Sequence, residues 1–313
     1  MKTIPPPDPK PKKPGCKLPP GACDSHCHVF GPADRFPYAP ERRYTPPDAP
    51  KTMLAALHAH LGLARAILVQ ASPHGSDNGA MLDAIASSNG CWRGVAIVGK
   101  DVGEAELARL HDGGVRGVRF NFVRHLGGAP DLDVVLRIQA RIKPLGWHLV
   151  LHLDAEDILA YAEFFHRFTI PFVIDHMGRV DAALGLEQKP FRLLLELMRN
   201  ELAWVKVSGA ERVSSAGPPF HDAIPFAAAL LHAAPDRTLW GTDFPHPNVK
   251  WMPNDGELVD LFARFSDDEA LRRKVLVDNP TRLAWSDAPL ELDQETSKAS
   301  RENVELTIQG GAR

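Results

Sequence analysis

Cysteine, tyrosine, excess charge and long apolar runs are all scarce in this sequence of 313 residues. It has four cysteines and three tyrosines, and its formal net charge is only −3. So small a charge indicates no broad surface for nucleic acid or for an acidic membrane. No apolar run approaches the roughly 20 residues that a membrane-spanning helix needs. We therefore expect neither nucleic acid nor a membrane as a partner, and any preference for an anionic ligand must arise locally.

A secretory segment is also lacking. The first twenty residues contain eight prolines and several lysines but no apolar run, which favours a cytoplasmic protein. In that compartment the cysteines are expected to be reduced thiols. The alternative is a structural zinc site built from Cys23, Cys27 and a histidine, although no second cysteine pair accompanies this spacing.

Eight short apolar segments recur along the chain and alternate with amphipathic helical patterns. Strands rich in valine, isoleucine and leucine that alternate with helices are typical of parallel βα units. Eight such units predict an α/β fold of the (β/α)8 TIM-barrel type. A doubly wound open sheet is the alternative, but no glycine-rich phosphate-binding turn follows any strand. The predicted strands are 22–30, 64–71, 93–98, 114–122, 148–154, 171–177, 203–209 and 238–244.

The same pattern sets the domain organisation. We expect residues 1–20 to be an extended proline- and lysine-rich tail, because proline cannot sustain a helix or a central strand. Residues 21–286 should form the barrel as one domain. Residues 287–313 are polar and uneven in character, and we expect them to be a second tail that frays.

Acid and imidazole side chains occupy the ends of particular strands. His26 and His28 are two residues apart on the first strand and therefore point the same way. His152 belongs to the fifth strand, His176 to the sixth and Asp243 to the eighth. In a closed barrel all five converge on one mouth. Such a group indicates a hydrolytic centre that either holds a divalent metal or polarises a carbonyl directly, with Asp243 deprotonating water.

Simpler interpretations stay open for each of these residues. A buried histidine can be a packing residue with its hydrogen bonds satisfied. A carboxylate at the end of an apolar strand must be paired, metal-bound or reactive, so Asp243 could instead form an ion pair with a neighbouring arginine.

Arginines follow several of the same strands. A single arginine is usually an exposed salt-bridge residue, but several at the carboxyl ends of strands indicate a mouth that binds carboxylates bidentately. Tyr44, in the loop after the first strand, could add a hydroxyl contact or cap the barrel. The arginines are Arg119, Arg124, Arg179 and Arg212.

An ordered series of motifs resembles the amidohydrolase superfamily and, within it, the 2-pyrone-4,6-dicarboxylate lactonase family. The resemblance runs from about residue 20 to Trp285 and implies a (β/α)8 barrel that opens small carboxylated lactones. The motifs are DSHCHVFGP, RYTPPDAP, VQASPHGSDN, VRGVRFNF, IDHMGR, AGPP and WGTDFPHPN.

Carried over by position, the resemblance implies Asp243 as the general base, with His26, His28 and His176 polarising the lactone carbonyl. The same carry-over assigns substrate binding to Tyr44, Arg119, Arg124, His152, Arg179 and Arg212.

The resemblance leaves the cofactor open. The pyrone lactonases work without a metal and have tyrosine at the fifth-strand position, where this chain has His152. Metal-bearing members of the superfamily hold one zinc or similar ion at the positions of His26, His28, His152 and Asp243. A two-metal centre is not expected, because Arg119 would repel a second cation.

The resemblance therefore implies reversible hydrolysis of 2-pyrone-4,6-dicarboxylate to the open-chain 4-oxalomesaconate or 4-carboxy-2-hydroxymuconate, in the breakdown of aromatic acids. One alternative is a zinc-dependent hydrolase of another lactone, such as a muconolactone or a sugar-acid lactone. A decarboxylase of the same superfamily is a second, and a non-catalytic barrel that binds dicarboxylates is a third. A homo-oligomer is possible in every case.

Overall fold

The computed structural model describes residues 2–286, so the tail predicted at 287–313 lies outside the described residues. Its centre is a sheet of eight parallel strands in which each strand pairs with the next along the chain. The strands are β2 (Cys23–Cys27), β4 (Arg65–Val69), β5 (Trp92–Ala96), β6 (Val115–Asn121), β7 (His148–His152), β8 (Phe172–Ile174), β9 (Ala203–Lys206) and β10 (Thr238–Leu239).

Backbone hydrogen bonds between the first and last strand segments close this sheet. Ser25 N donates to Trp240 O at 2.9 Å, and Asp243 N donates to His26 O at 2.7 Å. Gly241 lies at this seam, where a β-carbon would lie 2.3 Å from the backbone nitrogen of His26. Only glycine allows the two backbones to come so close. The predicted (β/α)8 barrel is confirmed.

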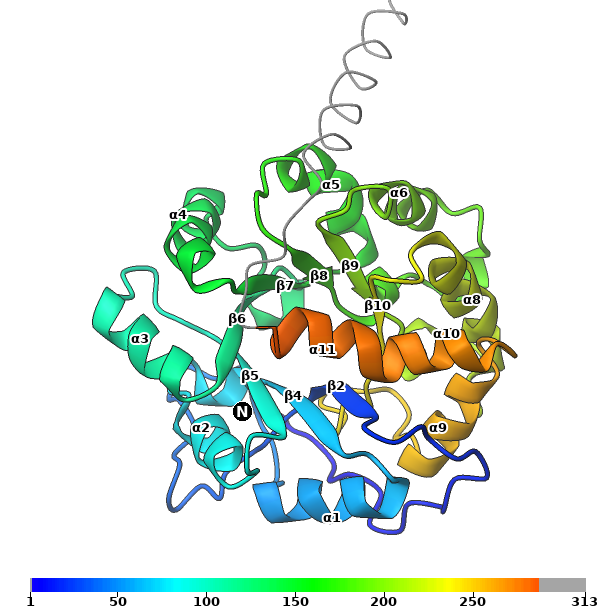
Figure 1. Cartoon of the computed structure of the whole chain (residues 1–313), viewed down its shortest axis with the longest axis horizontal. Coiled ribbons are helices and arrows are strands. Elements are labelled where there is room, and N and C mark those ends of the chain that lie inside the picture. Colours follow the sequence, from blue (N-terminus) through cyan, green and yellow to red (C-terminus); the bar gives the residue numbers. More distant parts are fainter. Residues whose placement is uncertain (1, 287–313) are drawn as a thin grey trace, which may run out of the picture.

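A ring of helices covers the outside of the barrel, and α11 crosses one end of it (Figure 1). Apolar side chains on the outer faces of the strands pack against these helices, while a separate cluster fills the barrel interior. The helices are α1 (Lys51–Leu61), α2 (Gly79–Ala86), α3 (Glu104–Asp112), α4 (Leu132–Ile142), α5 (Ala155–Phe165), α6 (Lys189–Leu197), α7 (Ala210–Val213), α8 (Ile224–Ala233), α9 (Asp255–Ala263), α10 (Glu269–Arg273) and α11 (Asn279–Ala284). None of the helices within residues 2–286 combines the length and apolar character needed to cross a membrane.

The interior cluster runs from the end of the barrel covered by α11 to Val69, the last residue of β4. Val150, Val173 and Trp204 contribute to it from β7, β8 and β9, and Leu283 and Ala284 of α11 pack against it. All five side chains are buried. This end of the barrel is therefore a closed apolar plug, which leaves the opposite mouth for polar groups.

All eight barrel strands are shorter than predicted. β8 ends at Ile174 and β10 at Leu239, whereas the sequence pattern extended them to 177 and 244. Neither strand reaches its candidate side chain, and the backbone excludes His176 and Asp243 from strand geometry, since their φ values are 52° and 65°. The left-handed region is costly for residues other than glycine and incompatible with a strand. Both candidate side chains therefore stand on turns beyond their strands.

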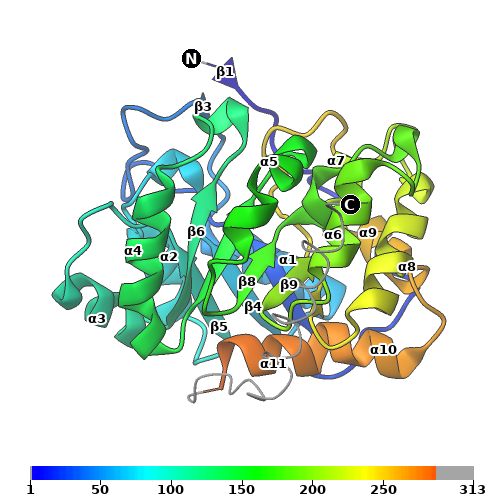
Figure 2. The same ribbon diagram turned by 90° about the horizontal axis from the view of Figure 1, so that it is seen from above.

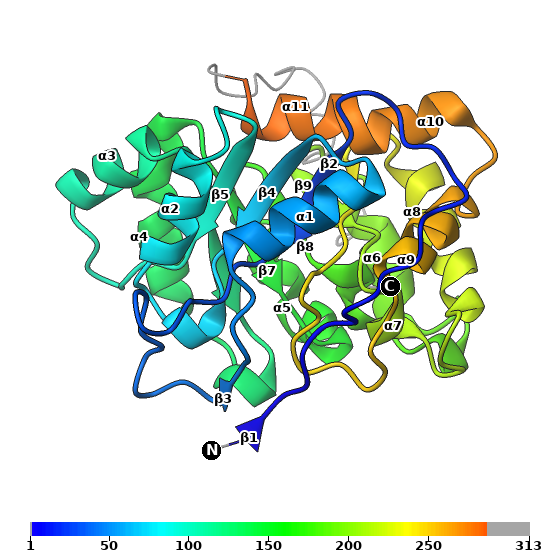
Figure 3. The same ribbon diagram turned by 90° about the horizontal axis from the view of Figure 1, so that it is seen from below.

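The amino-terminal segment contacts the barrel. Lys2–Thr3 form β1, which pairs in parallel with β3 (Tyr44–Thr45) in the loop between β2 and α1. Figure 2 shows β1 and β3 at the side of the molecule opposite α11, and Figure 3 shows the chain running from β1 past α9 to reach β2.

The two cysteines of the alternative zinc site do not meet. Cys23 belongs to the barrel interior, whereas Cys27 packs in the outer core, because the register shifts at a bulge between Asp24 and Cys27. Burial raises the pKa of the Cys23 thiol to about 12 and raises that of Cys27 as well. A shared zinc site is therefore the wrong interpretation, and both residues are buried free thiols.

Candidate active site

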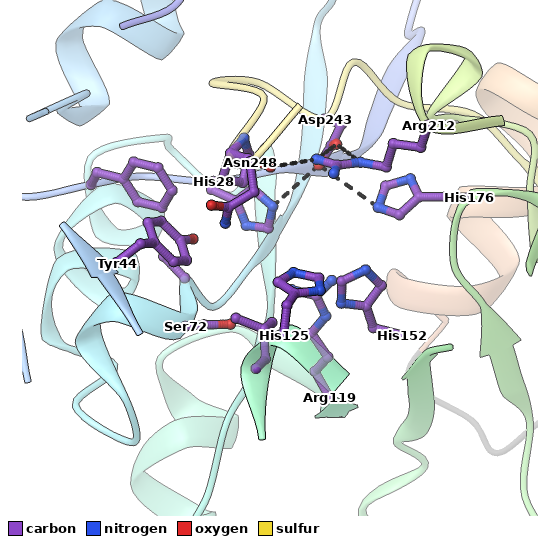
Figure 4. Close-up of a pocket in the computed structure, with 14 residues that line it drawn as sticks. His28, Tyr44, Ser72, Arg119, His125, His152, His176, Arg212, Asp243 and Asn248 are labelled. Atoms are coloured by element: carbon purple, nitrogen blue, oxygen red, sulfur yellow. Dashed lines mark hydrogen bonds and ion pairs between the residues drawn. The ribbon is translucent and has the colours of Figure 1, made fainter. Parts of the chain in front are cut away.

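A polar pocket opens at the carboxyl ends of the barrel strands (Figure 4). Its floor comes from residues at strand ends, and its rim comes from the loops that follow them. This is the end of a barrel where side chains of different strands can reach one ligand. The lining residues are His28, Phe30, Tyr44, Ala71, Ser72, Arg119, His125, Leu126, His152, His176, Arg212, Asp243, Pro247 and Asn248.

The Asp243 carboxylate is the centre of the floor. Its Oδ1 lies 3.3 Å from Nε2 of His28, 3.5 Å from Nε2 of His26 and 3.8 Å from Nε2 of His176. Its Oδ2 accepts hydrogen bonds from Nε of Arg212, at 2.7 Å, and from Nη2 of the same side chain. One oxygen is thus neutralised by a guanidinium, while the other faces three imidazole nitrogens.

Electrostatics keep Asp243 ionised. Burial alone would raise its pKa, but Arg212 and the neighbouring imidazoles hold that pKa well below the usual value. Asp243 therefore carries a negative charge at neutral pH, and its free oxygen can accept a proton.

The other ring nitrogens fix the orientation of the imidazoles. Nδ1 of His28 lies 2.8 Å from the carbonyl oxygen of Val69 and must donate to it, so a neutral His28 has a lone pair on Nε2. Nδ1 of His176 lies 3.1 Å from the hydroxyl of Ser208. Next to it, Gly209 leaves room for the ring, since a β-carbon there would lie 2.7 Å from Nδ1 of His176.

His152 sits beside this group. Its Nδ1 lies 3.1 Å from Oδ1 of Asn121 on the neighbouring strand, and its ring centroid is 5.8 Å from that of His176. Burial lowers the pKa of both imidazoles well below the ordinary value, helped for His152 by Arg119. Both rings are therefore neutral at physiological pH.

A buried ionic network supports His26 from below. Nδ1 of His26 lies 3.0 Å from Nζ of Lys206 and 3.2 Å from Oδ1 of Asp175. Lys206 and Arg119 both pair with Asp175, at 3.1 and 3.2 Å. Burial and the nearby Lys206 lower the pKa of His26 to about 3. The sequence interpretation missed Lys206 and Asp175, although a lysine within the apolar segment AWVKVSG was a visible signal.

The predicted arginines divide into two pairs. Arg119 and Arg212 line the pocket, whereas Arg124 and Arg179 do not. Nε of Arg179 pairs with Asp154 at 3.0 Å, and Arg124 is exposed, with its backbone nitrogen near the same carboxylate. Substrate contacts of these last two arginines stay a prediction.

Tyr44 lines the pocket from a loop opposite His176 and Arg212 (Figure 4), and its contact with substrate stays a prediction. It is buried, and burial raises the pKa of its phenol. Sequence reasoning missed Ser72, His125 and Asn248, which reach the pocket from loops. No strand pattern marks such residues, so only the folded chain reveals them.

Three of the four predicted metal ligands come together. One donor atom each from His26, His28 and Asp243 lie within 4.8 Å of one another, and all three residues are buried. Nε2 of His26 and Oδ1 of Asp243 have no hydrogen-bond partner. His152 is not part of this group, although its own Nε2 is also buried without a partner. The donor set fits one divalent ion, and the two adjacent cations, Lys206 and Arg212, oppose it.

Comparisons with known proteins agree with this geometry. The sequence model of the amidohydrolase family matches residues 23–283. A 2-pyrone-4,6-dicarboxylate hydrolase of Comamonas testosteroni is 50% identical over 285 residues, which cover 88% of this chain and 93% of that protein. A 4-sulfomuconolactone hydrolase of Rhizobium radiobacter is 42% identical over 270 residues, with coverages of 85% and 90%.

A solved structure gives the same result. The probable 2-pyrone-4,6-dicarboxylic acid hydrolase of Acinetobacter baumannii, crystallised with citric acid bound, superposes with a TM-score of 0.76 at 26% identity. The match covers 85% of this chain and all of that chain. The similarity therefore includes every barrel strand and the whole pocket.

Proposed function

Because the chain belongs to the amidohydrolase family, we propose that it is a lactonase that hydrolyses a small carboxylated lactone, namely 2-pyrone-4,6-dicarboxylate. The product is the open-chain 4-oxalomesaconate or its tautomer 4-carboxy-2-hydroxymuconate, and the reaction belongs to aromatic-acid catabolism. The observation that carries the proposal is the Asp243 carboxylate, whose free oxygen faces three imidazoles inside a pocket that also contains two arginines.

The charge of the pocket supports an anionic substrate. Arg119 supplies a guanidinium group that can bind a carboxylate through two parallel hydrogen bonds. Arg212 adds positive charge, although its Nε and Nη2 already donate to Asp243 and Pro247. His152, His176 and His26 are neutral and can act only as single donors or acceptors. A pocket with fixed cations and neutral imidazoles suits a ligand that brings its own negative charges.

Hydrolysis then follows from the positions of these groups. Oδ1 of Asp243 takes a proton from a water molecule while the water oxygen attacks the lactone carbonyl carbon. The carbonyl oxygen becomes an oxyanion, which imidazole N–H groups stabilise. The ring C–O bond breaks, and the proton held by Asp243 passes to the departing enol oxygen. The same groups lower the barrier for ring closure, so the reaction is reversible.

The tautomer of each imidazole decides whether its Nε2 can donate a hydrogen bond to the oxyanion. Ser208 can donate to Nδ1 of His176, which leaves the Nε2–H of that ring for the oxyanion. Lys206 can donate to Nδ1 of His26 with the same result. Asp175, which contacts the same Nδ1, favours the opposite tautomer with a lone pair on Nε2.

The second tautomer is the one that a metal site needs. With it, His26, His28 and Asp243 would hold one divalent ion such as zinc, and Asp175 would orient His26. Such an ion, when bound, supplies Lewis acidity and acidifies water. We propose the metal-free reaction first, because Lys206 and Arg212 already place two positive charges beside the same ligands.

The test is the loss of pyrone absorbance of 2-pyrone-4,6-dicarboxylate with enzyme as purified, after chelation and after addition of zinc. Turnover that survives chelation supports the metal-free lactonase, with His152 as a substrate contact. Turnover that is lost and then restored by zinc supports a metal-dependent lactonase, for which His26, His28 and Asp243 are the proposed ligands. No turnover in any state overturns the substrate assignment.

The alternative functions call for three further assays. The 42% identity to a 4-sulfomuconolactone hydrolase makes a sulfonated muconolactone the second substrate to assay. Release of carbon dioxide would identify a decarboxylase instead. Ligand affinity without turnover, unchanged in Asp243→Asn, would identify a dicarboxylate-binding barrel.

A further inference from the structure

We propose that residues 2–16, here termed the strap, form a positioning element that holds Tyr44 and Asn248 against the substrate. The strap contacts the two loops of the mouth that carry these side chains, although it lies outside the barrel. The kinetic part of this inference rests on the proposed lactone hydrolysis, whereas its structural part does not.

One end of the strap is paired with the Tyr44 loop. Lys2 is in register with Tyr44, and Thr3 with Thr45, in the parallel pair of β1 and β3. Ile4 N donates to Thr45 O at 3.4 Å, and the Ile4 side chain is 9% exposed. Within residues 2–286, β3 pairs with no strand other than β1. The strap therefore supplies the whole sheet pairing of the segment that carries Tyr44.

The other end of the strap is seated on the start of α9. Lys12 N donates to Oδ1 of Asn254 at 2.9 Å, and Nδ2 of Asn254 donates to Asp8 at 2.8 Å. Cys16 N donates to Asp260 at 2.9 Å, six residues further along. A β-carbon on Gly256 would lie 1.8 Å from the carbonyl oxygen of Lys12. The fit is so close that only glycine permits it.

The start of α9 is in turn tied to the mouth. Oδ1 of Asp255, the first residue of the helix, lies 3.0 Å from Nε2 of His246, and both side chains are buried. His246 stands two residues before Asn248, which lines the pocket together with Pro247. A displacement of α9 at Gly256 would therefore reach Asn248 through this buried pair.

The composition of the strap suits a spacer between these two anchors. Five of the seven residues from 5 to 11 are proline, which favours an extended polyproline conformation with little freedom to lose. Proline also has no N–H that needs a partner. The eight residue-to-residue steps from Ile4 to Lys12 would span about 25 Å at roughly 3.1 Å per step in this conformation. The strap is thus a stiff connection rather than a loose tail.

The first test separates docking from charge at the β3 end. Ile4→Asp places a carboxylate where the side chain is buried, whereas the matched control Thr3→Asp adds the same charge at an exposed position. We expect Ile4→Asp to raise KM about three- to tenfold with kcat within about twofold, because a positioning contact is lost while the floor of the pocket is intact.

The second test uses the α9 end. Gly256→Ala expels the Lys12 carbonyl but retains the helix, since alanine is the better helix former. Its control, Gly103→Ala, adds the same methyl group where no atom lies within 4 Å. Gly256→Ala should raise KM like Ile4→Asp, and Gly103→Ala should not.

Hydrogen exchange of residues 38–48 and 246–251 provides a readout that does not depend on turnover. Both strap variants should accelerate exchange there by roughly fivefold or more, and neither control should. Exchange rates and KM values equal to those of the controls would overturn the proposal. Accelerated exchange in a protein that opens no lactone would retain the strap and refute the proposed function.

Discussion

The two ends of the barrel are built from the same eight strands but from opposite kinds of side chain. At the amino-terminal end, Val173 and Trp204 pack against Leu283 of α11. At the carboxyl end, Asp243 and His26 lie among other ionisable groups, all buried. The backbone differs too. His176 and Asp243 at the mouth have positive φ, whereas no residue of the interior apolar cluster does.

The difference indicates that the apolar end contributes mainly to stability and the mouth mainly to activity. Burial of apolar surface stabilises the fold by about 25 cal/mol per Å², and the closed end of the barrel contributes this without any desolvated charge. Buried ion pairs contribute little net stability, because desolvation offsets their attraction. We therefore expect changes at the mouth to alter turnover and changes at the plug to alter stability. Four predictions test this separation.

The largest expected effect is that of Asp243→Asn. The amide cannot accept the proton of water, so we expect kcat to fall roughly 10³-fold while the protein stays folded. The matched control is Asp236→Asn, the same change at an exposed residue that pairs with Lys274 at 2.6 Å. Its kcat should match the wild type. A variant Asp243→Asn that keeps a tenth or more of the activity would contradict the assignment of the base.

The next largest effect belongs to the opposite end. Leu283→Ala removes a side chain that is 6% exposed in the interior cluster, and we expect the free energy of unfolding to fall by about 2–5 kcal/mol. Denaturant unfolding measures this change, and kcat of the folded enzyme should be unaltered. Leu184→Ala, at a position that is 66% exposed, should cost less than about 0.5 kcal/mol. A parallel loss of kcat in Leu283→Ala would show that the two ends are coupled.

The sequence alone predicted the apolar end better than the mouth. Continuous valine and isoleucine segments identify strands directly, so all eight were found. The histidine pair and Asp243 were found because polar residues stand out at the ends of apolar segments. The turns at His176 and Asp243 were missed, since positive φ at a residue other than glycine is imposed by tertiary contacts.

The pairing of charges was equally hidden. Arg212 was predicted as a substrate ligand, and in the structure it lines the pocket but also holds Oδ2 of Asp243. Asp175 was not predicted at all, although it joins Lys206, Arg119 and His26. Such a network depends on which strands become neighbours, and the pattern within one strand carries no information about that.

The third prediction concerns substrate affinity at the mouth. Arg119→Lys keeps the positive charge but loses the planar fork that can bind a carboxylate through two bonds. We expect KM to rise about tenfold, with a smaller change in kcat. Arg116→Lys on the same strand is the control, because Arg116 donates to the backbone oxygens of His111 and Val115 and does not line the pocket. Equal KM values for the two variants would remove Arg119 from the binding site.

The smallest expected effect concerns His148, a buried polar residue at the otherwise apolar end of the barrel. His148 and His152 lie at the two ends of β7, and both belong to the buried polar groups. Burial and the nearby Lys206 lower the pKa of His148 to about 3. Its folded pKa is therefore below the unfolded value of about 6.5. Between these two pH values the unfolded chain binds the extra proton, so stability decreases as the pH falls from 6.5 toward 3.

One such group contributes a slope of up to about 1.4 kcal/mol per pH unit. The free energy of unfolding should decrease between pH 6.5 and pH 5.5 in both proteins. The decrease should be about 1 kcal/mol smaller in His148→Gln than in the wild type, because the variant lacks this imidazole. His232→Gln, at an exposed position, should leave the difference unchanged. If His148→Gln also lowers kcat, then the imidazole at the start of β7 acts on the mouth through Lys206, and the separation of the two ends is incomplete. An unchanged kcat would mean that His148 affects only the stability of the fold and that the two ends of the barrel are separate.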